Sequence, residues 1–241
     1  MVALPTMNML RAITVPAGLL QKCPNPHKRH ITKFNYRRSK SMSTMASADS
    51  LPEHVMKVAA ISGSLRKSSF NRGLLRSAVE IAKESIPHME IDILEIAHLP
   101  FVNTDLEVNN RFPPSVEELR AKVLQADCIL FASPEYNYSV TSPLKNTLDW
   151  ASRHPNAWSD KPAAIMSAGG GYGGGLSQYH LRQIGVYLNL HFINKPELRI
   201  RAFEPPAKFD GDGNLIDDKI RELMKELLLS LSAYTRRLQN K

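Results

Sequence analysis

Residues that could bind a ligand or take part in a reaction are concentrated in three short segments. The first, residues 64–71, supplies three serine hydroxyls, an asparagine amide and the guanidinium of Arg66. A phosphate monoester carries nearly two negative charges, so it needs such donors, preferably at the N-terminus of a helix. The segment has no GxxxxGK pattern, which argues against a nucleoside-triphosphate cradle. It therefore predicts a phosphate site, or else a serine-rich turn that only caps a helix.

The second and third segments suit a flat heterocycle. Residues 134–139 read Pro-Glu-Tyr-Asn-Tyr-Ser and offer an aromatic wall with backbone N–H groups, although proline and asparagine are also ordinary turn formers. Residues 167–175 hold six of the chain's 12 glycines, which let backbone approach a ligand. A window this rich in glycine matches GxGxxG almost by necessity. The neat βα unit that such a fingerprint needs, with an acidic residue closing its second strand, is missing, so a Rossmann fingerprint is rejected. A flexible linker is the alternative.

Other candidate ligands are weak. Residues 210–214 resemble the start of a calcium loop, but Leu215 stands where glycine is needed and Arg221 where glutamate is needed, so a plain turn is expected. The eight histidines show no HExxH spacing, and Cys23 and Cys128 form no CxxC pair. We predict no metal site and no disulfide, and we expect Cys128 to be buried in a strand.

Alternating strand and helix patterns connect the three segments. Strands are expected at residues 58–61, 89–94, 129–132, 163–166 and 191–194. Helices are expected at residues 70–83, from 115 onward, 142–153, 176–190 and 217–238, with Ser115 and Glu118 at capping-box spacing. This order predicts a doubly wound α/β domain with a parallel sheet. Because each of the three segments follows a strand, all three are expected at the carboxyl edge of that sheet, where such folds bind ligands.

The charges divide the chain into two parts. Residues 1–48 hold eight Lys and Arg and no acid, whereas the chain from Asp49 onward balances 23 basic against 23 acidic residues. A neutral domain has no broad field for nucleic acid or an anionic membrane, so neither is expected as a partner. No apolar run approaches the roughly 18 residues that span a bilayer. We predict one domain at residues 51–241, long enough for one sizeable core.

The leader, residues 1–50, is basic, free of acids before Asp49, broken by prolines and richer in Ser and Thr toward its end. That composition fits a transit peptide for a chloroplast or mitochondrion. The alternatives are a disordered tail, or an upstream extension of a gene model whose working start is Met42, Met45 or Met56. In either of these cases the protein is expected in the cytoplasm.

Several ordered motifs resemble the NADPH-dependent FMN reductases, over about residues 56–240. The resemblance is nearest to their quinone-reductase branch, which includes plant NAD(P)H:quinone oxidoreductases and bacterial chromate/quinone reductases. It is carried by residues 63–71, 134–140, 144–150, 179–183 and 194–197. It implies a flavodoxin-like three-layer αβα sandwich whose five-stranded parallel sheet has the order 2-1-3-4-5. It also implies bound FMN, with NADPH or NADH as co-substrate.

The family's site residues carry over position by position. The resemblance assigns the FMN phosphate to Ser64, Leu65, Arg66, Ser69, Phe70 and Asn71. It assigns the isoalloxazine ring to Pro134, Glu135, Tyr136 and Asn137, and the loop after the fourth strand to Ser167 and Ala168. Relatives often have a hydroxyl in place of Ala168, which puts one hydrogen bond to the flavin in question.

The activity that the resemblance implies is two-electron reduction of quinones to hydroquinones. In this ping-pong scheme NAD(P)H reduces the FMN and leaves before the quinone enters the same space, so no catalytic side chain is required. The resemblance also implies a homotetramer, a dimer of dimers, with Tyr179 and Glu197 in the segment that helps assembly. The alternatives are a non-enzymatic FMN electron carrier or regulator, and an NADPH-dependent FMN, chromate or azo reductase.

Overall fold

The computed structural model describes residues 54–109 and 111–240. The predicted leader, residues 1–50, and its boundary with the domain lie outside the described residues. The described chain forms a parallel sheet of six strands, listed here in chain order: β1 Met56–Ser62, β2 Met89–Leu94, β3 Cys128–Ala132, β4 Pro162–Gly169, β5 His191–Phe192 and β6 Leu198–Arg201. Their spatial order is β2-β1-β3-β4-β5, with β6 also paired to β4. This confirms the predicted order 2-1-3-4-5.

The fifth position of the sheet differs from the prediction. One strand was expected at residues 191–194, but β5 pairs with the start of β4 and β6 pairs with its end. The segment between them contains Pro196, which has no N–H to donate to a ladder. The sequence pattern therefore missed β6.

The helices lie close to the predicted ranges: α1 Phe70–Ser85, α2 Pro114–Gln125, α3 Ser142–Ser152, α4 Gly175–Leu188 and α5 Asp218–Gln239, with a short 3-10 turn, η1, at Thr104–Leu106. The predicted capping box at Ser115 and Glu118 is wrong. Pro113 is the N-cap of α2, because Pro114 already takes the first helical position. Instead, the side chain of Glu117 reaches back past the N-cap, and its Oε1 accepts the N–H of Phe112 at 2.9 Å.

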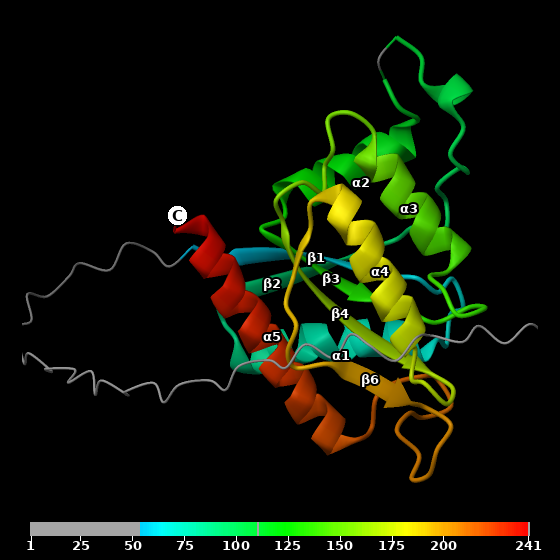
Figure 1. Ribbon diagram of the computed structural model, residues 1–241. Coiled ribbons are helices and arrows are strands. Elements are labelled where there is room, and N and C mark those ends of the chain that lie inside the picture. Colours follow the sequence, from blue (N-terminus) through cyan, green and yellow to red (C-terminus); the bar gives the residue numbers. More distant parts are fainter. Residues whose placement is uncertain (1–53, 110, 241) are drawn as a thin grey trace, which may run out of the picture. The chain divides into compact units, whose positions relative to one another are not determined.

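Figure 1 shows α1 and α5 on one face of the sheet and α2, α3 and α4 on the other. Each face has its own apolar cluster, one including Ala60, Leu130 and Met166, and the other Ile61, Phe131 and Trp158. All five residues of β3 are buried, as expected of a central parallel strand. Cys128 is buried there as predicted, and burial raises the pKa of its thiol to about 12. The strands thus form a rigid platform for the loops at their ends.

Two absences can be stated for the described residues. Within 54–109 and 111–240 no helix is long and apolar enough to cross a membrane. The same residues contain no group of three or more His, Cys, Asp or Glu that could hold a metal ion. Residues 210–214 form a turn, in which Asp210 Oδ1 accepts the N–H groups of Asp212 and Asn214.

Candidate functional site

The three segments singled out in the sequence, residues 64–71, 134–139 and 167–175, meet at the carboxyl edge of β1, β3 and β4, as predicted. The register pairs Ser62 with Ala132 and Ala132 with Met166, so the strands end side by side. Gly63 joins the first loop to the second: its N–H donates to the Ala132 carbonyl at 2.9 Å, and its own carbonyl accepts the Thr141 hydroxyl at 2.6 Å. A Cβ at position 63 would lie 2.9 Å from Thr141 Oγ1. Only glycine lets these loops approach so closely.

The first loop folds back on itself before α1 begins. The Arg66 N–H donates to Ser64 Oγ at 3.3 Å, and the Arg66 guanidinium donates to the Ser68 carbonyl at 2.8 Å. Ser64 and Ser69 are buried, whereas Arg66 is exposed. The loop therefore presents hydroxyls and a guanidinium around the start of a helix.

The N-terminus of α1 is open, in contrast to its neighbours. Ser69 is the N-cap of α1, yet its side chain makes no cap hydrogen bond. Thr141 accepts an N–H at the start of α3, and Asp217 does so at the start of α5. At α4, Glu135 Oε2 accepts the Leu176 N–H at 2.9 Å. The first N–H groups of α1 are therefore available to an anion, which the helix dipole favours.

Asn71 ties the first loop to the third. Its amide donates to the Ala168 carbonyl at 2.8 Å, and its Oδ1 accepts the Ala168 N–H at 3.0 Å. Both residues are buried. The side chain of Asn71 therefore holds the end of β4 against the start of α1.

The second loop is a tight turn that exposes Tyr136. The N–H of Tyr136 donates to the Ser139 carbonyl at 3.1 Å and the Ser139 N–H returns to the Tyr136 carbonyl at 3.0 Å. Asn137 and Tyr138 have φ values of 50° and 65°, which suits a hairpin-type turn. The Tyr136 side chain is 53% exposed, and Ser139 is fixed by its 2.9 Å contact with His180 Nδ1. This leaves an aromatic ring at the mouth of the site.

The third loop is a folded turn, so the linker alternative is wrong. Ser167 Oγ donates to the Gly173 carbonyl at 2.6 Å and accepts from Gln178 Nε2 at 2.8 Å. Gly174 has a φ of +82°, and a Cβ there would lie 2.6 Å from that of Ser167. Three of the residues that hold these loops, Thr141, Gln178 and His180, were not singled out as ligands or loop anchors from the sequence. Of these three, only Thr141 could have been recognised from the sequence, because a hydroxyl directly before a helix is typical of an N-cap.

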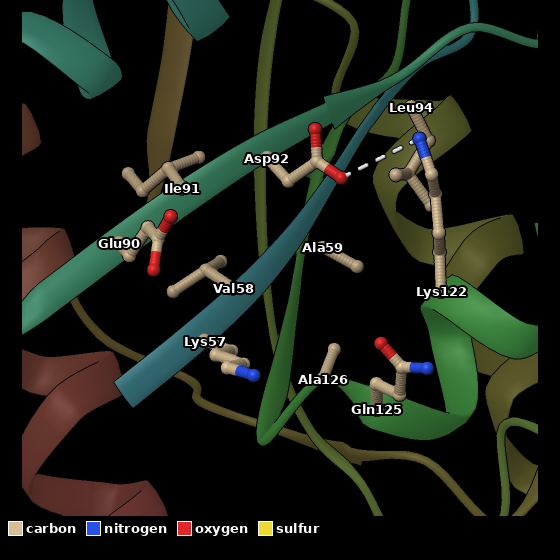
Figure 2. Close-up of a pocket in the computed structure, with 10 residues that line it drawn as sticks. All are labelled: Lys57, Val58, Ala59, Glu90, Ile91, Asp92, Leu94, Lys122, Gln125 and Ala126. Carbon is tan, nitrogen blue, oxygen red and sulfur yellow. Dashed lines mark ion pairs between the residues drawn. The ribbon is translucent and has the colours of Figure 1, made fainter. Parts of the chain in front are cut away.

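Hollows in the described residues also lie outside the meeting point of the loops. One of about 480 Å³ lies beside the second loop, between Phe101, Val140 and Ile184. Another, of about 330 Å³, lies along the outer strand β2. Figure 2 shows its lining residues, among which Asp92 and Lys122 form an ion pair at 3.7 Å. This hollow is lined by the start of β1, by β2 and by the end of α2, so none of the predicted site residues reaches it.

A family model described as NADPH-dependent FMN reductase matches residues 56–204. The chain belongs to the NADPH-dependent FMN reductase family. An NADPH:quinone oxidoreductase of Arabidopsis thaliana is 64% identical over 187 residues, which cover 78% of this chain and 95% of the relative. An NAD(P)H-dependent FMN reductase of Pseudomonas aeruginosa is 45% identical over 186 residues, covering 76% and 97%. The solved structure of FerB, a flavoenzyme NAD(P)H:(acceptor) oxidoreductase of Paracoccus denitrificans, has a TM-score of 0.66 at 30% identity, covering 76% and 98%.

The residues present in this FMN reductase fit the cofactor after which the family is named. FMN carries one phosphate monoester and one planar ring. The first loop offers an open helix N-terminus with Ser64, Ser69 and Arg66 for the phosphate. Tyr136 and the glycine-rich turn leave an exposed, flat approach for the ring. The predicted fold and family are thus confirmed together.

Proposed function

We propose that this protein is an FMN-dependent NAD(P)H:quinone oxidoreductase that reduces quinones to hydroquinones by two electrons. Its plant relatives support the reaction, because one at 65% identity from Oryza sativa is named probable NADPH:quinone oxidoreductase 1 and one from Arabidopsis thaliana NADPH:quinone oxidoreductase. A Burkholderia relative at 32% identity is named 2-hydroxy-1,4-benzoquinone reductase. The observation that carries the proposal is the open start of α1 beside an exposed aromatic and a glycine-rich turn.

The first loop would hold the FMN phosphate. Ser64, Arg66 and Ser69 would donate to its oxygens together with the N–H groups of α1. Leu65 is half exposed at the rim of the loop, and Phe70 stacks on Phe209 with ring centroids 4.4 Å apart, which fixes the first turn of the helix. Asn71 would act through the backbone of Ala168.

The second and third loops would hold the ring. Pro134, Tyr136 and Asn137 would line one side of it, and the backbone of Ser167 and Ala168 the other. Glu135 would serve by fixing α4, since its carboxylate accepts N–H groups there. When bound, FMN supplies the hydride and electron chemistry, and the chain positions it.

A bleaching experiment tests the proposal. The protein purified with FMN is mixed anaerobically with NADPH in a stopped-flow instrument, and the flavin absorbance is followed. We expect the flavin bands to bleach and a quinone added afterwards to restore them. Flavin that stays oxidised would leave the electron-carrier alternative in place of the reductase.

We further propose a homotetramer, assembled as a dimer of dimers. The outer face of α4 supports it, because Tyr179, Val186 and Tyr187 are exposed there, Tyr187 at 87%. Apolar surface of this kind is typical of association sites. Light scattering of the purified protein measures the mass directly, and a monomer would contradict the proposal.

For the leader, residues 1–50, we propose import into a chloroplast or mitochondrion followed by cleavage. N-terminal sequencing of the mature protein from native tissue tests this. A mature chain that begins at Met1, or at an internal methionine without import, would place the protein in the cytoplasm.

A further inference from the structure

Two arginines, Arg199 and Arg201, lie on one face of β6 beside the glycine-rich turn. β6 runs parallel to the end of β4, with Arg199 opposite Ser167 and Arg201 opposite Gly169. Leu198 and Ile200 alternate with them and pack into the core with α5. The arginines therefore face the side of the sheet that α4 covers (Figure 1), because side chains alternate along a strand.

Arg199 lies across the first turn of α4. A Cβ added at Gly175 would be 3.0 Å from Arg199 Nη1 and 3.2 Å from its Cδ. Glycine at position 175 thus makes room for the guanidinium. The positive charge of Arg199 therefore lies next to the glycine-rich turn, residues 167–175. Ser167, at the other end of this turn, is proposed to border the FMN ring.

The arginines belong to a cluster with a net positive charge. Arg199 Nη2 lies 2.9 Å from Glu197 Oε2, and Arg201 Nη1 lies 3.3 Å from Glu204 Oε1. Lys195 also contacts Glu197, at 3.4 Å. Three cations therefore face two carboxylates. A guanidinium has five N–H donors, and in the single chain these side chains are still 42% and 60% exposed, so both can take a further acceptor.

We propose that Arg199 and Arg201 bind the 2′-phosphate of NADPH and so make this enzyme prefer NADPH to NADH. The inference rests on the proposed function, in which a nicotinamide nucleotide must reach the ring from outside the glycine-rich turn. A 2′-phosphate is a dianionic monoester that suits a pair of guanidiniums, whereas NADH has a neutral hydroxyl there. Phe203 follows Arg201 by two residues and is 76% exposed, which gives the adenine a flat apolar surface.

Direct binding of nucleotide fragments tests the proposal without turnover. Adenosine 2′,5′-bisphosphate and 5′-AMP differ by the phosphate in question. Calorimetry on the full-length, FMN-loaded protein measures both dissociation constants at fixed salt for the wild type, R199Q, R201Q and K83Q. Lys83 is an exposed cation in the last turn of α1, so K83Q is the matched control for net charge.

We expect the wild type to bind the bisphosphate at least about tenfold more tightly than 5′-AMP, as for one or two charge-assisted hydrogen bonds. Each glutamine variant at β6 should lower this ratio severalfold while K83Q keeps it, and all four proteins should retain FMN. A wild type without the preference, or R199Q and R201Q that both keep it, would overturn the inference. Loss of FMN from either variant would assign the arginines to the flavin phosphate instead.

The same proteins separate this inference from the proposed function. Anaerobic mixing with NADPH reports flavin reduction independently of the fragment titrations. Flavin that stays oxidised while the bisphosphate preference holds would contradict the reductase alone. Flavin that is reduced equally well at low NADPH and low NADH would contradict the arginine assignment alone.

Discussion

Two helices begin at the same edge of the sheet, and their N-termini are arranged in opposite ways. The start of α1 has hydroxyls and a guanidinium nearby, but its N-cap side chain makes no bond to the helix. The start of α4 is closed by Glu135, which accepts the N–H groups of Leu176 and Ser177. The same chemical groups, free N–H donors with a partial positive charge, thus serve different purposes at the two places.

The two termini are therefore expected to have different roles, ligand binding at α1 and structural support at α4. At α1 no N-cap side chain takes up the donors, which supports the proposal that they bind the FMN phosphate. At α4 an internal carboxylate takes up the corresponding donors, and the hydrogen bonds of Ser167 and Gln178 fix the glycine-rich turn in front of the helix. We therefore expect substitutions at the closed terminus to change stability, and substitutions at the open terminus to change FMN affinity.

The largest effect is expected for Gly174→Ala at the closed terminus. The residue has a φ of +82°, and its new Cβ would overlap that of Ser167. The left-handed conformation and the overlap together should lower the free energy of unfolding by about 3 kcal/mol. Urea unfolding of the apoprotein measures it.

Gly170→Ala is the matched control, since a Cβ there would meet no atom within 4 Å. It should cost no more than about 0.5 kcal/mol. If both alanine variants unfold at the same urea concentration, the turn is a pliable linker and the closed terminus has no structural basis.

Asn71→Ala removes the connection between the two termini. The amide of Asn71 partners both backbone groups of the buried Ala168. Leaving them unpaired should cost about 2 kcal/mol in urea unfolding. Asn71→Asp keeps the acceptor but sets a buried carboxylate oxygen against the Ala168 carbonyl, so we expect a loss at least as large as that of the alanine variant. An alanine variant as stable as the wild type would show that the two regions are independent.

Arg66→Ala tests the open terminus. Loss of the guanidinium should raise the dissociation constant of FMN by about tenfold, as for one charge-assisted hydrogen bond. Fluorescence titration of apoprotein with FMN measures the constant. The urea midpoint of the apoprotein should move little, because Arg66 is exposed and its guanidinium contacts only the Ser68 carbonyl and the Phe70 ring, close by in the sequence.

Lys67→Ala provides the comparison, because Lys67 is the adjacent exposed cation. A screened surface charge should change FMN affinity by less than about twofold. Equal weakening by both variants would mean that the loop attracts FMN by charge alone and has no defined phosphate site.

The strands and the edge on which the loops meet were predictable, because they follow from short-range patterns. Continuous apolar runs identified β3 and β4, and the rule for parallel sheets placed residues 64, 134 and 167 together. The family resemblance supplied the strand order. β6 was missed because Leu198–Arg201 has only four residues, two of them arginines, and reads as polar loop.

The internal contacts of the site could not be predicted, because they depend on which side chain meets which backbone group across long sequence distances. The sequence does not show whether the Asn71 side chain binds a ligand or pairs with the backbone of Ala168, 97 residues away. Arg120 shows the same limit. Its buried guanidinium donates to the carbonyl of Arg153, which follows α3 directly, and to that of Pro155 in the loop beyond. Burial lowers its pKa, yet in the sequence it reads as an ordinary helix cation.

The smallest effect, and the one that discriminates most finely, is expected at Glu135. The carboxylate caps α4, so Glu135→Ala should lower the free energy of unfolding by about 1 kcal/mol. Glu135→Gln keeps an oxygen acceptor and loses only the charge that complements the helix dipole, so it should cost about 0.5 kcal/mol. Neither variant should change the FMN dissociation constant as Arg66→Ala does. If Glu135→Gln weakened FMN binding tenfold and left the urea midpoint unchanged, the carboxylate would belong to the flavin, and the contrast between the open and the closed terminus would fail.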